Sequence, residues 1–304
     1  MGYGARDDGL MSIAPIIILV GIAPGAFYLW YVYHLDVYEP EPKKLVLKTF
    51  LYGIFFAFGA AWVEQVILNL ILFPGHHLNH TISNPLLAQL PWPVLAFFCF
   101  IVVGPVEEFA KYYAVVKVLT PQSSPSTQYR KLFGHLVYQK AASIYDSPDF
   151  NEPMDGIVYA SAAALGFATL ETIGDLFIYG IKGIIARAFL AVPAHLLFSC
   201  FWGYGLGKGV SNPEARKEFP LWFGAGALAH GLWDFSIFFF MSKFNEQYFG
   251  VLLDFVFLIG MYFWARKKVR WAEEVSPFKE KALHLFKSQI GGLSSASENK
   301  MDPT

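Results

Sequence analysis

Ionisable side chains lie inside otherwise apolar stretches of this chain, at spacings that hydrolytic sites use. The first group is Glu107-Glu108-Phe109-Ala110-Lys111, which follows Gly104-Pro105. An ionisable group at the centre of a bilayer costs at least about 2.5 kcal/mol, so one that persists there needs a partner or a purpose. Lys111 follows the two glutamates by four and three residues and can reach either on a helix. Adjacent residues point about 100° apart, so we expect the two carboxylates to face different neighbours.

Two histidines and further acids follow in later apolar stretches. His195 precedes Ser199 by four residues, and His230 precedes Asp234 by the same step, while Glu171 closes a run of small and apolar residues. Imidazoles and carboxylates converging in a helical bundle are suited to a zinc site that keeps one position open for water. They are equally suited to a metal-independent site in which a glutamate activates the water.

The candidate roles divide into three sets. We expect the catalytic residues to be Glu107, Glu108, His195 and His230, with one of the two glutamates deprotonating a water. The supporting residues are Lys111, Glu171, Asp234, Asp155 and Ser199. If a metal such as Zn²⁺ is bound, its expected ligands are His195, His230, Glu108 and Glu171.

Structural roles are the alternatives at several of these positions. Glu107, Glu108 and Lys111 together are compatible with a buried ion pair that has no catalytic duty. Asp155 stands at a helix start, where capping is the ordinary role. Asp234 and Glu171 are also suited to orienting a histidine rather than binding a metal. Arg187 is interpreted as an interfacial residue.

The composition shows what must hold these residues. Of 304 residues, 55% are hydrophobic and 15% are charged, and the mean hydropathy is +0.41. Soluble domains carry about a quarter of charged residues, so a water-soluble enzyme is excluded and the lipid bilayer becomes a partner of the chain. The net charge of −1 provides no general attraction to nucleic acid. The two cysteines, Cys99 and Cys200, lie in apolar runs and provide neither a disulfide framework nor a cysteine zinc knuckle.

The expected fold is all-α, a polytopic transmembrane helix bundle of about seven spans, with eight as the alternative count. A spanning helix needs about 20 predominantly apolar residues. That criterion places spans at 11–33, 45–73, 92–119, 154–179, 184–207, 219–241 and 248–265. Small residues over 160–166 predict that the fourth span is an interior helix, and Pro105 predicts a kink or a widened turn in the third. The site residues then fall at similar depths near the midplane.

Basic residues predict the orientation. Most Lys and Arg residues fall in alternate loops and in the C-terminal tail, which is the pattern of cytoplasmic segments. We therefore expect a multi-pass cell-membrane protein with its N-terminus outside and its C-terminus in the cytoplasm. Residues 1–270 form one integral-membrane catalytic domain. Residues 271–304 form a cytoplasmic tail, first an amphipathic segment and then a disordered one.

Taken in order, these motifs resemble the PrsW family of intramembrane proteases. The resemblance rests on Glu107-Glu108-Phe109-Ala110-Lys111, then 152–159 and 166–171, then His195-Leu196-Leu197-Phe198-Ser199, and finally His230-Gly231-Leu232-Trp233-Asp234. That family is related to the CAAX prenyl-protein endopeptidases and the bacteriocin-immunity (Abi) proteins. The resemblance implies peptide-bond hydrolysis within the bilayer, with Glu107 and Glu108 at the paired-glutamate position and His195 and His230 at the two histidine positions. It also implies a membrane-protein substrate of the single-span type, such as an anti-sigma factor cut at a first site.

Three other functions remain open at this point. A CAAX-type endopeptidase would cut prenylated peptides. A proton-coupled transporter would use the midplane carboxylates as a relay, although no internal repeat supports it. A non-catalytic membrane-peptide binding protein would hold its ligand intact.

Overall fold

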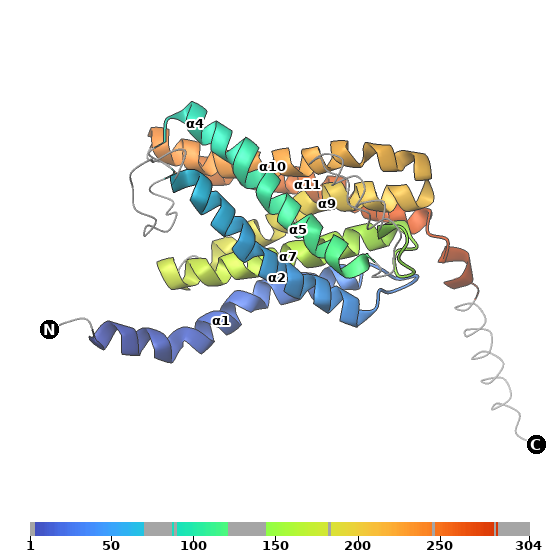
Figure 1. Ribbon diagram of the computed structural model, residues 1–304, viewed down its shortest axis with the longest axis horizontal. Coiled ribbons are helices and arrows are strands. Elements are labelled where there is room, and N and C mark those ends of the chain that lie inside the picture. The colour runs from blue at the N-terminus through green and yellow to red at the C-terminus, as the bar shows by residue number, and fades with distance from the viewer. Residues whose placement is uncertain are drawn as a thin grey trace, which may run out of the picture.

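The structure is a computed structural model of the whole chain, and it describes residues 4–69, 87, 90–120, 144–181, 184–244, 247–282 and 284. Within these ranges the regular structure is entirely helical (Figure 1). The helices are α1 (Gly4–Tyr33), α2 (Lys43–Ile67), α4 (Trp92–Phe97), η2 (Phe98–Val103), α5 (Gly104–Leu119), α7 (Pro153–Tyr179), α8 (Ile184–Ala186), η5 (Arg187–Ala191), α9 (Val192–Ser211), η6 (Pro213–Glu218), α10 (Phe219–Phe244) and α11 (Gln247–Glu274).

Seven helical stretches of the described chain are long and apolar enough to cross a membrane, which confirms the predicted bundle. Most predicted ends lie within a few residues of the observed ones. The seventh span differs most, because α11 continues to Glu274 rather than stopping near 265. Its last turns therefore run past the boundary at 270 that we expected between domain and tail. The amphipathic segment expected after it lies only partly within the described residues, and the disorder expected near the C-terminus lies outside them.

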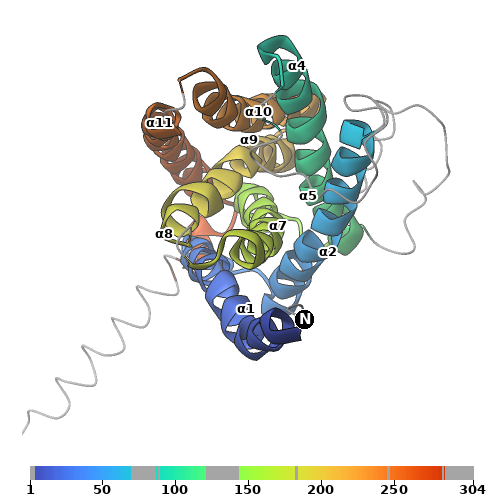
Figure 2. The ribbon, with the colours of Figure 1, turned by 90° about the vertical axis from the view of Figure 1, so that its left-hand side faces the viewer.

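Helix α7 runs through the centre of the bundle, as its small residues predict (Figure 2). It packs against α9, α2 and α1, and 83% of its spanning window is buried. Two glycines show how close the neighbours come. A Cβ added at Gly166 would lie 1.9 Å from the Phe50 carbonyl oxygen of α2, and one at Gly207 would lie 2.0 Å from the Pro153 carbonyl oxygen of α7. Because glycine has only a hydrogen atom as its side chain, these two positions let the backbones of α2, α7 and α9 come into contact.

Two π-helical segments interrupt the helices that carry the site. Phe98–Val103 precedes Gly104-Pro105, where the sequence predicted a kink or a widened turn. Arg187–Ala191 stands in the same relation to Pro193, in α9. Such wide turns often occur at functional sites because they shift the register of the residues that follow.

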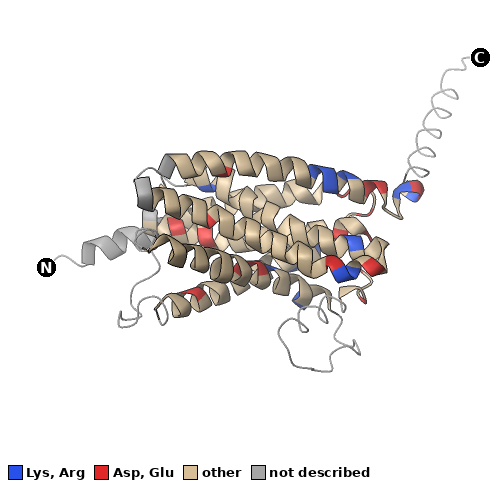
Figure 3. Cartoon of the chain, turned by 90° about the horizontal axis from the view of Figure 1, so that it is seen from above, with Lys and Arg blue, Asp and Glu red and all other residues tan. Residues whose placement is uncertain are grey.

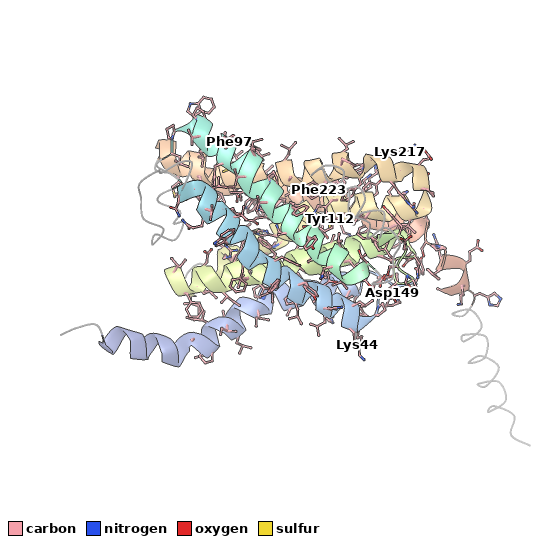
Figure 4. The ribbon with its side chains drawn as sticks, viewed as in Figure 1. Lys44, Phe97, Tyr112, Asp149, Lys217 and Phe223 are labelled. Atoms are coloured by element: carbon pink, nitrogen blue, oxygen red, sulfur yellow. The ribbon has the colours of Figure 1, made fainter. Side chains whose placement is uncertain are left out.

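The basic residues gather at one end of the bundle (Figure 3). Most of the Lys and Arg residues that the picture colours lie at the end from which α11 leads to the C-terminus, and the N-terminus lies at the other end. Figure 4 places Lys44, Asp149 and Lys217 at this same end, which we call the charged end. Between the two ends the surface is apolar, with large exposed side chains such as Phe55, Trp62 and Phe263, which is what lipid contact requires.

Candidate active site

The centre of the site is an ion pair between Glu108 and Lys111 of α5, both fully buried. The Lys111 Nζ donates to Glu108 Oε1 at 2.7 Å. The second oxygen of Glu108, Oε2, accepts from Ser199 Oγ and from Trp202 Nε1 of α9, each at 2.8 Å. Both oxygens of Glu108 therefore have strong donors, and the carboxylate joins α5 to α9. The Phe167 ring of α7 lies 4.6 Å from Lys111 Nζ and covers the ammonium group.

The two histidines lie side by side on this ion pair, with ring centroids 5.0 Å apart. His230 Nδ1 lies 3.0 Å from Glu108 Oε1, so it carries the proton and donates it, and Nε2 keeps its lone pair. His195 has the opposite tautomer. Its Nε2 lies 2.8 Å from Glu171 Oε2, while its Nδ1 accepts from Lys111 Nζ at 2.9 Å. Carboxylates thus fix the tautomer of each ring.

Glu107 differs from its neighbour in what it contacts. Its Oε2 is buried and accepts no hydrogen bond from the described part of the chain. It lies 3.5 Å from His230 Nε2, 3.8 Å from His195 Nδ1 and 3.5 Å from Lys111 Nζ. The expectation that the two glutamates face different neighbours is wrong, because both reach His230 and Lys111. Their side chains bend toward a shared centre although their Cβ atoms diverge.

A second group of charges lies on the outer side of the histidines. Arg187 pairs with Glu171 at 3.3 Å and with Asp175 at 2.5 Å, and its Nε donates to Thr172 Oγ1. Arg187 therefore does not simply face lipid, since it joins η5 to α7 beside the site, and its place at the membrane interface stays a prediction. The exposed fraction of the side chains rises from 0% at Glu108 to 32% at Glu171 and 36% at Asp175. The site is thus closed at Glu108 and opens toward these acids.

The remaining predicted residues divide into near and distant. Asp234 Oδ2 lies 3.6 Å from His230 Nε2, on the same face of α10. Asp155 lies at the other end of α7, sixteen residues before Glu171, a separation of about 24 Å along a helix. Its Oδ2 accepts from the Glu152 backbone N–H, so it caps α7, as the ordinary reading of that position predicts.

Sequence reasoning missed two contributors. Trp202 lies seven residues after His195, on the same helix face, so the period of α9 could have identified it. Glu64 of α2 was a carboxylate in an apolar span, which is itself a signal of function. It lies near enough to Glu107 and Glu171 to interact with them electrostatically, and its Oε1 is buried without a hydrogen-bond partner in the described chain.

The residues that can share a metal ion are Glu107, His195 and His230, each of which offers a ligand atom within 4.8 Å of the others. This grouping replaces Glu108 by Glu107 in the expected ligand set, and it leaves Glu171 as the partner of His195. The donor chemistry fits zinc, because two imidazoles and a carboxylate leave a fourth position open. The orphaned Oε2 of Glu107 is consistent with this fit. Lys111 contacts His195 Nδ1, so a metal bound through that atom would have to displace the ammonium group.

Comparison with known proteins identifies the family to which a chain with this site belongs. The family model described as "PrsW family intramembrane metalloprotease" matches residues 41–261. The chain belongs to the PrsW family. Curated relatives named "Protease PrsW" include one from Geobacillus kaustophilus, 29% identical over 274 residues, which cover 88% of this chain and 99% of the relative. Another, from Bacillus subtilis, is 30% identical over 223 residues, or 73% of this chain and 82% of the relative. No solved structure matches the chain.

Membership of the PrsW family identifies the chain as a multi-pass intramembrane protease. The matched region begins at Glu41 and includes every residue of the site described above. The family match alone does not assign the residue that activates the water or the residues that bind a metal. Those assignments rest on the contacts of Glu107, Glu108 and the two histidines.

Proposed function

We propose that the chain hydrolyses a peptide bond of a membrane protein within the bilayer, with Glu107 as the general base. One observation carries the assignment. Glu108 is saturated by donors from Lys111, His230, Ser199 and Trp202, whereas Glu107 Oε2 accepts no hydrogen bond in the described chain. Only a carboxylate with a free oxygen can accept a proton from a water without breaking an existing network.

The reaction requires one water and one base. Glu107 Oε2 takes a proton from the water while the oxygen of that water bonds to the scissile carbonyl carbon. As the carbon–nitrogen bond breaks, the same proton passes to the leaving nitrogen. Lys111 Nζ lies on the same side as Glu107 Oε2, and its positive charge favours the negative charge that develops on the carbonyl oxygen. His230 adds to this effect only when its Nε2 has taken up a proton.

Glu108 acts as a positioning residue in this proposal. It holds the Nδ1 proton of His230, so that Nε2 faces Glu107, and it anchors Lys111 between the two acids. Glu171 does the same for His195. Asp234 is placed beside His230 Nε2, where it stabilises a protonated ring.

Glu107, His195 and His230 are the residues that would hold a metal such as Zn²⁺, and in that case the Glu107 carboxylate would be a ligand instead of the base. A bound zinc ion would polarise the scissile carbonyl and acidify the attacking water. The role of Glu108 is the same with or without the metal, because an outer carboxylate fixes the ring of a histidine in either case.

The substrate we propose is a single-span membrane protein such as an anti-sigma factor, cut within or beside its membrane helix. The most exposed acids of the site, Glu171 and Asp175, lie toward the end of α7 opposite the charged end. Orientation follows from the charges. We propose that the charged end is cytoplasmic, since Lys and Arg residues gather there, which puts the N-terminus outside. Fusions of a fluorescent protein and of alkaline phosphatase to the C-terminus test this directly: fluorescence without phosphatase activity supports it, and the reverse overturns it.

Cleavage of a panel of single-span peptides by the purified chain tests the base assignment. We compare Glu107→Gln, Glu108→Gln and His195→Ala, with Asp254→Asn as the matched control, because Asp254 is a buried acid of α11 that accepts from Ser236 and, within the described chain, contacts neither the glutamates nor the histidines of the site. Loss of a general base costs about 10²- to 10⁴-fold in rate, so Glu107→Gln should lose turnover while remaining folded. Cleavage that survives Glu107→Gln would overturn the assignment. Adding prenylated peptides to the panel separates this activity from a CAAX-type endopeptidase.

A further inference from the structure

A second cluster of acids lies at the charged end of the bundle, away from the histidines. It comprises Asp36, Glu39 and Glu41 from the segment between α1 and α2, together with Glu152 and Asp155 at the start of α7. Four of the five are nearly inaccessible, with exposed fractions of 4% for Asp36, 1% for Glu41, 1% for Glu152 and 0% for Asp155. Four acids buried together require compensation.

The hydrogen bonds around this cluster leave an oxygen free on each buried acid. Asp155 uses Oδ2 to accept from the backbone N–H groups of Asn151 and Glu152. Glu41 uses Oε2 to accept from the Tyr159 hydroxyl, and Glu152 uses Oε2 to accept from the Ser276 hydroxyl.

The carboxyl groups contact one another, Asp36 with Glu152 and Glu41 with Asp155, and their remaining oxygens have no donor from another part of the described chain. In the described part of the chain Asp36 Oδ2, Glu41 Oε1, Glu152 Oε1 and Asp155 Oδ1 are buried without a hydrogen-bond partner. Lysine, arginine and histidine form no ion pair with these carboxylates within the same ranges.

Oxygens of these acids also lie close together. Asp36, Glu152 and Asp155 each offer an oxygen within 4.8 Å of the other two, and so do Glu39, Glu41 and Asp155. Two oxygens on opposite sides of a calcium ion are about 4.6–5.2 Å apart, because each Ca–O distance is about 2.3–2.6 Å. One ion can therefore touch all three oxygens of a triad.

We propose that Asp36, Glu152 and Asp155 bind a hard divalent cation of the calcium type, with Glu41 and Glu39 adding negative charge beside it. All the ligand atoms are oxygens, whereas zinc prefers nitrogen and sulfur ligands, so the site is not suited to zinc. Calcium is favoured over magnesium because it accepts many irregularly placed carboxylates, whereas magnesium retains several waters. The site is distinct from the Glu107–His195–His230 group and does not depend on the function proposed for it.

The bound ion would connect three parts of the chain. Asp36 follows α1, Glu152 caps α7, and Ser276, which bonds Glu152, follows α11. A cation at this point would fix the end of the central helix against the first and last spans. Its effect is expected on the stability of the bundle rather than on the chemical step.

Titration of the full chain, purified in nanodiscs and freed of metal by a chelator, tests the site. Ca²⁺, Mg²⁺ and Tb³⁺ are the probes, and the readouts are the midpoint of thermal unfolding and Tb³⁺ luminescence sensitised by the tyrosine at 159, whose hydroxyl bonds Glu41. We expect saturable binding, with Ca²⁺ displacing Tb³⁺ at a concentration at least tenfold lower than Mg²⁺.

The variants are Asp36→Asn and Glu152→Gln, with Asp254→Asn as the matched buried acid outside the cluster. Both cluster variants should weaken Ca²⁺ binding at least tenfold, and Asp254→Asn should leave it unchanged. Asp36→Asn removes one of several unpaired charges, so it should equal or exceed the wild type in midpoint under chelator and fall below it in Ca²⁺. Absence of a Ca²⁺ response in the folded wild type, or a response that survives both variants, would overturn the proposal.

Discussion

The contacts of Glu108 make its replacement the most informative test of how the site is held together. In Glu108→Gln the Lys111 ammonium stays fully buried and loses its partner at 2.7 Å. The remaining carboxylate, Glu107, lies 3.5 Å from it and accepts no hydrogen bond. Removing one member of a buried ion pair costs about 3–5 kcal/mol, because an uncompensated charge is left behind. We expect Glu108→Gln to lose that amount of unfolding free energy.

Two companion variants separate charge from packing. Glu107→Gln breaks no hydrogen bond and leaves Lys111 paired with Glu108, so it should cost less than Glu108→Gln. Glu108→Gln combined with Lys111→Met removes both charges and keeps most of the side-chain volume. The double variant should then recover part of the loss, since removing both partners of a buried pair is often close to neutral.

The assay is unfolding at equilibrium in micelles or nanodiscs, followed by circular dichroism and checked by gel filtration. Our reasoning predicts the order Glu107→Gln, then the double variant, then Glu108→Gln, from most to least stable. It fails if Glu107→Gln is destabilised as much as Glu108→Gln, or if adding Lys111→Met to Glu108→Gln lowers stability further.

Three further outcomes follow from other parts of the structure. Metal analysis of the wild type beside a His195→Ala/His230→Ala double variant should show metal lost in the variant, and equal metal content would remove these histidines from the ligand set. Gly166→Val should prevent a stable bundle from forming, as seen by gel filtration and circular dichroism, because even a Cβ would lie 1.9 Å from the Phe50 carbonyl oxygen; a folded Gly166→Val protein would show that α2 can move away. Arg187→Ala should leave Glu171 and Asp175 without their shared cation and lower turnover more than stability, whereas Arg187→Lys should restore part of the turnover; equal turnover in all three proteins would contradict a role beside the site.

The sequence was sufficient to predict the bundle because bilayer thickness is a fixed length against which apolar runs can be measured. Small residues in the fourth span marked the central helix for a similar reason, since only they allow backbones to touch. The convergence of Glu107, His195 and His230 was also predictable, because ionisable groups at the same depth in a bilayer are stable only when they face one another inside the bundle.

The contacts of individual site residues could not be predicted from the sequence, because they depend on how far each flexible side chain extends. Glu107 and Glu108 are adjacent, and their helical directions alone indicate that they face apart, yet flexible side chains bring both to His230. Which of the two is saturated is decided by Ser199 and Trp202 on another helix. Arg187 was unpredictable in the same way, because its partners on α7 become neighbours only when the chain turns back between α7 and α8.

The two wide turns before Pro105 and Pro193 have a consequence for how this sequence can change. Each residue of an α-helix advances the face by about 100°, so deleting one residue from Phe98–Val103 would swing Glu107 and Glu108 away from α9 and α10. A similar deletion in Arg187–Ala191 would turn His195 away from Lys111. Apart from Arg187, whose charge pairs with Glu171 and Asp175, exchanges of apolar residues in these segments alter only local packing, whereas a change of length dismantles the site. Insertions and deletions, rather than exchanges of one apolar residue for another, should therefore be the changes that these two stretches exclude.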